Sequence, residues 1–402
     1  MVNDWPGVAD SVPTATRDTL VPLRLRLTKP DTPHAVDFGR DVHCVLGLPF
    51  DAVSLDDAVA KVRHAAQTRT PCFVSTPNVN FLVASQTDSA FRASVFHSDL
   101  SVADGMPIVW MARLLGLPIR ERVAGSDLFD RLRADAEHPL GVYFFGGPDG
   151  VAERASIELN ATPGGLRGVG GESPGAGSAA DLCKPDSIER INASGAHFLA
   201  VALGAKKGQA WIELGRGRLK VPVISHLGAV VNFVGAGLAR APVWARRLGV
   251  EWCWRILGER NLWRRYWDDG RDLVALAFTR LIPTLWLTRV VMSSRRDGAP
   301  GAVSVLETPS RFKMDISGEW RSGNALPLRA ALSRAADSDK AIEVIFERGT
   351  SIDLGVVALL LLLKGFCASR ATGVSIVAHD PAIRRLLRLC DVSSQVPTEA
   401  GQ

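Results

Sequence analysis

Apolar runs of strand length alternate with helical periodicity between residues 38 and 240, and the turns between them are rich in glycine and polar residues. Short apolar runs are typical of buried strands, whereas apolar residues spaced three and four apart indicate helices. Strands that alternate with helices predict a parallel sheet with helices on both faces. We therefore expect a Rossmann-like α/β core over residues 38–240, with strands near 42–48, 72–75, 100–103, 142–145, 198–203 and 221–224. Residues 161–187 are rich in glycine, proline and serine, and we expect them to form a surface loop.

The pattern changes after residue 240, where tryptophan and arginine crowd together. Five of the ten tryptophans lie between residues 240 and 267, interleaved with seven arginines. This mixture is typical of a helix at a bilayer interface, although a helix packed on its own domain would show it too. The apolar stretch 273–292 contains Arg280, Pro283 and Arg289, and a central arginine costs about 2.5 to 3.5 kcal/mol on insertion scales. We expect 241–292 to be a helical membrane-associating appendage that lies in the interface.

A second, smaller α/β pattern follows a charged linker at 293–302. Its strands are expected at 303–305, 312–316, 341–346 and 374–378, and its helices at 325–336, 355–369 and 381–389. This order, together with Ile352-Asp353-Leu354-Gly355, resembles a STAS domain, the fold of anti-sigma-factor antagonists. The resemblance implies a STAS-like domain over 303–395 with a protein partner. The phosphorylated side chain of that family would fall near Leu354, so Thr350 and Ser351 are the nearest substitutes.

Length and composition set outer limits on the protein. A chain of 402 residues suggests two domains. Six scattered cysteines without C-x-x-C or zinc spacing indicate a reduced, cytoplasmic protein with buried thiols. Residues 1–37 contain five prolines and no continuous apolar core, so we interpret them as a flexible arm rather than a signal peptide. The net charge is +5, and most of the basic residues are arginine. An excess of arginine suits phosphate ligands or an anionic membrane surface, although codon bias would give the same excess. We expect no nucleic-acid partner.

Polar side chains follow two neighbouring apolar runs. Thr76-Pro77-Asn78 comes directly after the run at 72–75, and Asp104-Gly105 comes directly after 100–103. Open α/β sheets bind their ligands at the carboxyl ends of the strands. The sequence therefore predicts a site that contains both loops.

Three motifs, Thr76-Pro77-Asn78, Ala103-Asp104-Gly105 and Arg122-Val123-Ala124-Gly125-Ser126-Asp127, resemble those of the WecG/TagA/CpsF glycosyltransferases in order and spacing, and the resemblance continues to about Tyr266. These enzymes transfer a sugar from a nucleotide donor to a polyprenyl-diphosphate-linked acceptor. The resemblance implies an inverting hexosyltransferase that uses a UDP-sugar and an undecaprenyl-diphosphate-linked glycan in bacterial surface polysaccharide or exopolysaccharide biosynthesis. It also implies a peripheral enzyme on the cytoplasmic face of the inner membrane, and it leaves a homo-oligomer open.

The chemistry needs one base, because the acceptor hydroxyl must lose a proton as it attacks the anomeric carbon. Asp104, on a glycine-flanked loop, is our candidate, as the resemblance also implies. Thr76 and Asn78 would hydrogen-bond the sugar or the acceptor. Side chains of all three types also cap helices, so capping is the alternative interpretation of each.

The predicted substrate-binding residues lie on further loops. A turn such as Gly146-Gly147 before a helix can hold a phosphate through backbone N–H groups, although a plain tight turn looks the same. Where the family reads Gly-x-Pro-Lys-Gln-Glu-x-Trp, this chain has Gly208 at the glutamine position and Gln209 at the glutamate position. These departures leave the donor open between N-acetylmannosamine and a hexuronic sugar. Arg122 and Asp127 are expected chiefly to fix a loop. His226 and Asn232 stand where relatives carry glycine and aspartate. The full set of predicted substrate-binding residues is Gly105, Arg122, Asp127, Gly146, Gly147, Lys207, Gln209, His226, Asn232, Arg240, Arg255, Arg264 and Arg265.

We expect no cofactor and no metal. Many sugar transferases bind a metal through Asp-x-Asp, and this chain has that spacing only at Asp337-Ser338-Asp339, in the second domain. Arginines and backbone donors would then meet the phosphate charge. The alternative function is a regulatory or binding protein in which a degenerate transferase core is the scaffold for a STAS interaction module.

Overall fold

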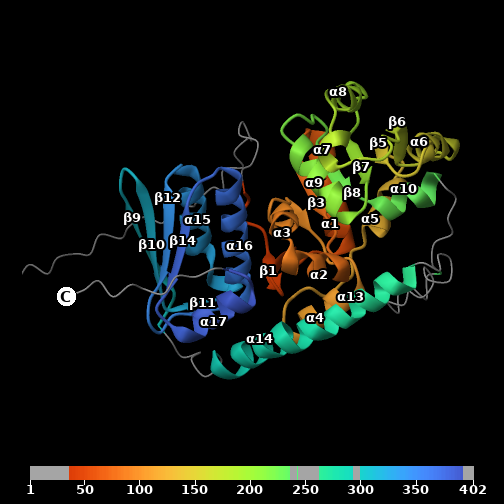
Figure 1. Ribbon diagram of the computed structural model, residues 1–402. Helices are drawn as coiled ribbons and strands as arrows, with labels where there is room; N and C mark the ends of the chain where they lie inside the picture. Colours follow the sequence, from red (N-terminus) through yellow and green to blue (C-terminus); the bar gives the residue numbers. More distant parts are fainter. Residues whose placement is uncertain (1–35, 236–241, 243–261, 293–298, 393–402) are drawn as a thin grey trace, which may run out of the picture.

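The computed structural model describes residues 36–235, 242, 262–292 and 299–392 (Figure 1). The N-terminal domain contains a six-stranded sheet in the order β4-β3-β8-β7-β5-β6, and all of its neighbouring strands are parallel. This confirms the predicted Rossmann-like core. The strands are β3 (Cys72–Ser75), β4 (Leu100–Ser101), β5 (Leu140–Gly146), β6 (Leu166–Glu172), β7 (Phe198–Ala202) and β8 (Val223–His226).

Helices cover both faces of this sheet because its strands are apolar on both sides. Phe144 points into the core on one face and Phe145 into the core on the other, as the period-2 geometry of a strand requires. One face carries α1 (Leu55–Thr68), α5 (Gly125–Ala134), α6 (Val151–Ala161) and α10 (Gly228–Gly235). The other carries α7 (Ala179–Leu182), α8 (Pro185–Ala193) and α9 (Ala205–Gly215).

Two sequence predictions are wrong in this domain. The predicted strand at 42–48 is a hairpin outside the sheet, β1 (Val42–Val45) with β2 (Leu48–Asp51). Its turn places Leu46 and Gly47 at φ 49° and 93°, the positive values of a two-residue hairpin turn. The predicted surface loop at 161–187 contains β6, where glycines let α6 approach: a Cβ on Gly168 would lie 2.1 Å from the Ser156 carbonyl oxygen.

The second domain has the four predicted strands, and they form one mixed sheet. Its strand order is β14-β12-β10-β9, with β9 antiparallel to β10 and the other pairs parallel. Helices α15, α16 and α17 pack with this sheet, and α16 lies toward β1 (Figure 1). The bounds are β9 (Ala302–Glu307), β10 (Arg311–Ser317), β11 (Glu319–Trp320), α15 (Leu326–Asp337), β12 (Ala341–Phe346), β13 (Ser351–Ile352), α16 (Leu354–Ser369), β14 (Val374–Ala378) and α17 (Pro381–Leu389).

The two domains share one continuous hydrophobic core. Helix α16 is buried at 13 of its 16 positions and packs against β1, β2 and α3 (Ser89–Phe96) of the first domain. The His97 ring Nε2 lies 3.0 Å from the Gly365 carbonyl oxygen, and Asp391 pairs with Arg92 at 2.6 Å. The apolar run of α16 is therefore a domain interface as well as a core helix.

Thr350 and Ser351 are unsuitable as exposed phosphorylation sites. Both side chains are buried, with 0% and 1% of their surface exposed. The Thr350 hydroxyl donates to the Glu347 carbonyl oxygen at 2.8 Å and lies 3.1 Å from the Ile316 carbonyl oxygen. A phosphate on either residue would have to enter the packed interior.

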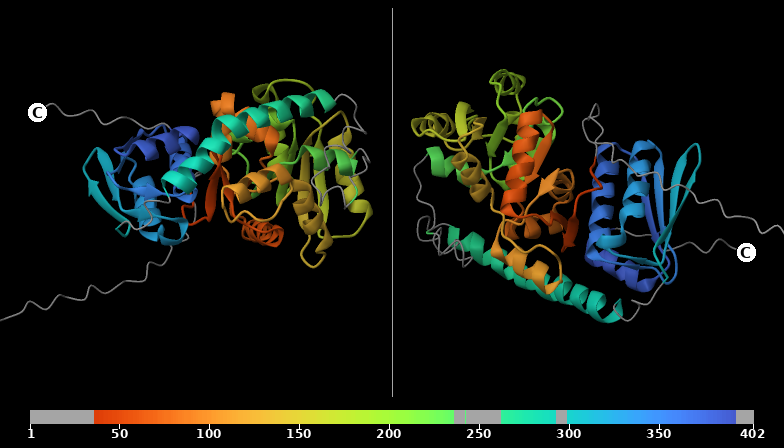
Figure 2. Two further views of the ribbon diagram at one scale, coloured as in Figure 1. Left: turned by 90° about the horizontal axis from the view of Figure 1, so that it is seen from below. Right: turned by 180° about the vertical axis from the view of Figure 1, so that it is seen from behind.

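A long helix runs along both domains, as Figures 1 and 2 show. It comprises α13 (Leu262–Leu276), a π-helical turn at Ala277–Leu281, α14 (Ile282–Trp286) and a second π-helical turn at Leu287–Val291. It packs on α2 (Val79–Thr87) and on α17. The segment Trp267–Val291 is long and apolar enough to cross a membrane, by length and composition alone.

Candidate functional site

Backbone hydrogen bonds bring the two predicted catalytic loops together. The Val102 N–H donates to the Ser75 carbonyl oxygen at 3.0 Å, and the Asp104 N–H donates to the Pro77 carbonyl oxygen at 3.1 Å. The loops after β3 and β4 therefore run side by side at the carboxyl edge of the sheet. Thr76, Asn78 and Asp104 lie on this one edge, as the sequence predicts.

Asp104 does not occupy the capping position of the helix that follows. Helix α4 (Met106–Leu114) has Gly105 as its N-cap, and no side chain caps it. Gly105 has φ 132°, a conformation that favours glycine. The Asp104 residue is half-buried, so it is neither sealed in the core nor held out in solvent. The capping alternative is wrong for Asp104, and its role as a base stays a prediction.

Asn78 and Thr76 have visible structural roles. The Asn78 side-chain oxygen accepts a hydrogen bond from the Phe81 N–H at 3.2 Å and caps α2. Thr76 is 7% exposed and lies against the start of α5, where a Cβ on Gly125 would be 3.2 Å from its methyl carbon. Capping uses the oxygen of Asn78 and leaves its role toward a substrate a prediction.

The Arg-x-x-Gly-x-Asp motif connects α5 to the loop that follows β4. Arg122 forms an ion pair with Asp127, and the Val123 N–H donates to the Ala103 carbonyl oxygen at 2.9 Å. A Cβ on Gly125 would lie 2.4 Å from a methyl carbon of Leu227, so a larger residue here would force the Leu227 side chain or α5 to move. The ion pair matches the predicted loop-fixing role of Arg122 and Asp127.

The glycine turn after β5 is tight and internally bonded. Gly146 has φ 108° and Gly147 has φ 81°, and a Cβ on Gly146 would lie 2.5 Å from the Ala202 carbonyl oxygen. The Gly147 N–H donates to that same oxygen at 2.8 Å, and the Val151 N–H donates to Pro148. These donors already have protein partners, which favours the tight-turn alternative over a phosphate cradle.

Four predicted binding residues on α9, β8 and α10 differ in their surroundings. Lys207 is exposed, whereas Gln209 is fully buried and donates to the Ser75 hydroxyl at 3.1 Å. His226 ends β8, and burial lowers the pKa of its imidazole to about 4. Asn232 is half-buried on α10.

Ser75 was absent from the predicted site. Its hydroxyl accepts hydrogen bonds from Gln209 and, at 2.6 Å, from Ser98, so it ties the end of β3 to α9 and to the chain after α3. Its place as the last residue before Thr76 was the available signal. A buried serine with two donors toward it is a positioning residue for the loop.

The long helix of the appendage lies beside α2, which follows the Thr76-Pro77-Asn78 loop. The Asn80 side-chain amide, on α2, donates to Asp269 of α13 at 3.1 Å. Arg264 is exposed and its guanidinium carbon lies 5.6 Å from the centre of the Trp263 ring. Arg240, Arg255 and the side chain of Arg265 lie outside the described residues.

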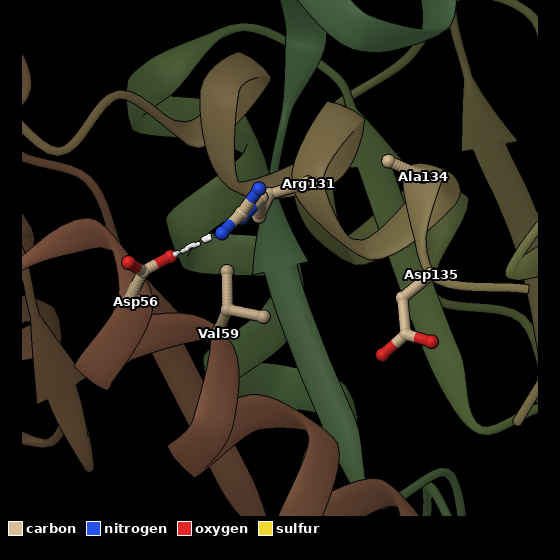
Figure 3. A pocket seen from close by; sticks show the side chains of 5 residues that line it. All are labelled: Asp56, Val59, Arg131, Ala134 and Asp135. Atoms are coloured by element: carbon tan, nitrogen blue, oxygen red, sulfur yellow. Dashed lines mark hydrogen bonds and ion pairs between the residues drawn. The ribbon is translucent and has the colours of Figure 1, made fainter. Parts of the chain in front are cut away.

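No group of three or more His, Cys, Asp or Glu side chains within the described ranges could hold a metal ion. The Asp-x-Asp sequence lies at the end of α15, where Asp339 pairs with Arg370 at 2.7 Å. A shallow pocket of about 340 Å³ lies between α1 and α5 (Figure 3). It contains no predicted site residue, and its ion pair joins the exposed side chains of Asp56 and Arg131, so we do not assign it to the reaction.

A parallel sheet with helices on both faces and polar residues at its carboxyl edge defines a doubly wound α/β protein, a class that binds its ligands at this edge. The chain belongs to the glycosyl transferase WecG/TagA/CpsF family, whose sequence model matches residues 43–284. A second model, of the Mlab-type STAS domain, matches residues 303–397. The chain is therefore a glycosyltransferase with a C-terminal STAS domain.

Curated relatives resemble the first domain. The chain is 27% identical over 198 residues to an N-acetylglucosaminyldiphosphoundecaprenol N-acetyl-β-D-mannosaminyltransferase of Bacillus spizizenii, and the aligned region covers 48% of this chain and 74% of the relative. It is 24% identical over 229 residues to the enzyme of the same name from Staphylococcus aureus, and the aligned region covers 55% of this chain and 85% of the relative. These alignments cover about half of this chain.

Proposed function

We propose that this protein transfers a sugar from a UDP-sugar to a polyprenyl-diphosphate-linked glycan, in the synthesis of a surface polysaccharide. The names of the relatives, which act on an undecaprenyl-diphosphate-linked sugar, support the acceptor class. The observation that carries the proposal is the junction of the two loops, which places Asp104 beside Thr76 and Asn78 through direct backbone hydrogen bonds.

In the proposed step, the Asp104 carboxylate takes the proton of the acceptor hydroxyl. The acceptor oxygen then forms a bond to the anomeric carbon while the bond from that carbon to the UDP oxygen breaks. UDP leaves with the bonding electrons, and the configuration at the anomeric carbon inverts because attack and departure occur on opposite faces. Arginines of the appendage, including Arg264, would stabilise the leaving diphosphate.

The base is tested by Asp104→Asn, which keeps the size of the side chain and removes its charge. General-base catalysis contributes about 10² to 10⁴ in rate, so we expect kcat to fall at least 100-fold with an unchanged melting temperature. Asp56→Asn, in the exposed pocket of Figure 3, is the matched control and should retain wild-type activity. Activity within threefold of wild type for Asp104→Asn would exclude the base.

Metal independence is tested with EDTA on purified enzyme, a UDP-sugar and a lipid-diphosphate acceptor. We expect full activity after chelation, because arginines and backbone donors would meet the phosphate charge. Loss of activity that manganese restores would contradict this part of the proposal.

We also propose that the long helix rests on the cytoplasmic face of the inner membrane without crossing it. One side of the helix is packed on the protein through buried Leu276, Leu281 and Leu287. The other side exposes apolar residues, most of them four apart, as expected for a helix lying in the interface. They are Trp263, Trp267, Val274, Phe278, Ile282, Trp286 and Val290.

Vesicle flotation tests this placement. The wild type should float with vesicles that contain anionic lipid, and the double variant Trp267→Ser, Phe278→Ser should remain at the bottom of the gradient. Ile157→Ser removes an equally exposed apolar side chain on α6 and should float like the wild type. Resistance to carbonate extraction from native membranes would show instead that the helix spans.

The shared core bears on the regulatory alternative. Deleting residues 302–402 would strip α16 from β1, β2 and α3, so the loss of polymer after such a deletion would follow from unfolding alone. Point variants separate the two functions better. If Asp104→Ala leaves polymer production intact in cells, the scaffold alternative replaces the transferase.

A further inference from the structure

The side chains of positions 208 and 226 compete for one space at the carboxyl edge of the sheet. A Cβ on Gly208, in the first turn of α9, would lie 2.2 Å from the Cδ2 atom of His226 and 3.1 Å from its Nε2 atom. No real side chain tolerates the shorter distance. In its observed position the imidazole of His226 therefore excludes a Cβ at position 208, so the two positions are sterically coupled.

His226 is the last residue of β8, at the carboxyl edge of the sheet where the candidate site lies. Its Nε2 atom is buried and has no hydrogen-bond partner in the part of the chain that the structure describes. The same atom lies 3.6 Å from the Cβ position of Gly228, the first residue of α10. Strand β8 is the direct neighbour of β3, which leads into Thr76. Leaving a buried polar atom unpaired costs about 1 to 3 kcal/mol, a cost that a bound ligand would remove.

We propose that His226 is a donor-binding residue whose Nε2 atom hydrogen-bonds an uncharged hydroxyl or amide group of the nucleotide-sugar. This inference rests on the proposed function and adds the substrate class: an uncharged hexose or N-acetylhexosamine rather than a hexuronic sugar. Burial in a site without a countercharge keeps the imidazole neutral at physiological pH, since its pKa is lowered to about 4. A neutral imidazole satisfies a hydroxyl or amide and offers no charge to a carboxylate.

The test compares His226→Leu, which keeps bulk and removes the nitrogen, with His226→Gln, which retains a polar group near the Nε2 position. We expect His226→Leu to lower kcat/KM for an uncharged UDP-sugar about tenfold, mainly through KM, with no loss of melting temperature. His226→Gln should stay within threefold of wild type. A purely structural role predicts the reverse: a lower melting temperature and an unchanged donor KM, which would overturn the inference. Preference of the wild type for a UDP-hexuronic acid would also overturn it.

A second pair of variants tests the coupling. Gly208→Ala should lower the melting temperature, and adding His226→Gly should restore it, because the second change clears the space that the new methyl group needs. Equal losses with and without His226→Gly would contradict the coupling. Failure of the proposed function has a separate signature: the wild type transfers no sugar from any UDP-sugar. Calorimetric binding of UDP-N-acetylhexosamine to wild type and His226→Leu then decides the inference, and equal affinity or no binding to either overturns it.

Discussion

Asp391 joins three parts of the molecule through one carboxylate. It pairs with Arg92 of α3 at 2.6 Å and with Arg280 of the long helix at 2.8 Å, and it belongs to the STAS domain. Its side chain is 22% exposed, and those of Arg92 and Arg280 are 16% and 21% exposed. Hydrogen bonds to charged groups in such partly buried places contribute about 1.5 to 3 kcal/mol each. We predict that Asp391→Asn destabilises the protein by about 2 kcal/mol, because asparagine retains one acceptor but loses the charge.

Asp339→Asn is the matched control for this change. Asp339 also pairs with an arginine, Arg370, at 2.7 Å, but its side chain is 76% exposed, and exposed pairs contribute at most about 1 kcal/mol. Both aspartates have positive φ, 57° for Asp391 and 51° for Asp339, and asparagine tolerates that conformation equally well. Backbone strain therefore cancels from the comparison, and the difference reports the ion pairs.

The assay is urea unfolding of the full chain, with hydrogen exchange measured in β1 and α16. We expect Asp391→Asn to lower the unfolding midpoint clearly and to speed exchange at both elements, because the shared core opens more often. Asp339→Asn should change stability by less than about 0.5 kcal/mol. Equal stability of the two variants would refute the view that Asp391 fastens the domains together.

Three further predictions concern packing, pH and thiol chemistry. Gly125→Ala should cost about 1 to 3 kcal/mol and most of the activity, measured by melting temperature and turnover, because the new Cβ would lie 2.4 Å from Leu227. The pKa of His226 is about 4 in the folded protein and 6.5 in the unfolded chain, so between these pH values the unfolded chain binds a proton that the folded protein does not. The folded protein should therefore have its full stability above pH 6.5 and lose up to about 3 kcal/mol as the pH falls toward 4. Unfolding midpoints measured across this pH range should show the loss in the wild type and not in His226→Gln. Burial raises the pKa of Cys72 to about 12, so iodoacetamide at pH 8 should leave it unmodified in the native protein and label it in urea, as peptide mass spectrometry would show.

The order of most strands and helices was readable from the sequence because it depends on local periodicity; the β1-β2 hairpin and β6 were the exceptions. Each strand of a parallel sheet needs a crossover helix, so motifs at strand ends were bound to meet at one edge. This is why the pattern along the chain sufficed to place Thr76, Asn78 and Asp104 together. The STAS domain was recognisable for the same reason.

Glycine-rich segments were harder to interpret, because glycine has no local preference of its own. The stretch around Gly168 looked like a loop, yet it forms β6, where only glycine lets α6 lie against the strand. The turn at Gly146 and Gly147 looked like a phosphate cradle, yet β7 takes the Gly147 donor. In each case the deciding partner is remote in sequence.

By itself the sequence determined the family, five of the six strands of the parallel sheet and the loops that carry Thr76, Asn78 and Asp104, since these follow from local periodicity and short motifs. Only the tertiary structure decided that α16 joins the two domains, that Gly105 rather than Asp104 occupies the capping position, and that His226 lies over Gly208. Packing between separate elements decides such contacts, and no local pattern along the chain records them.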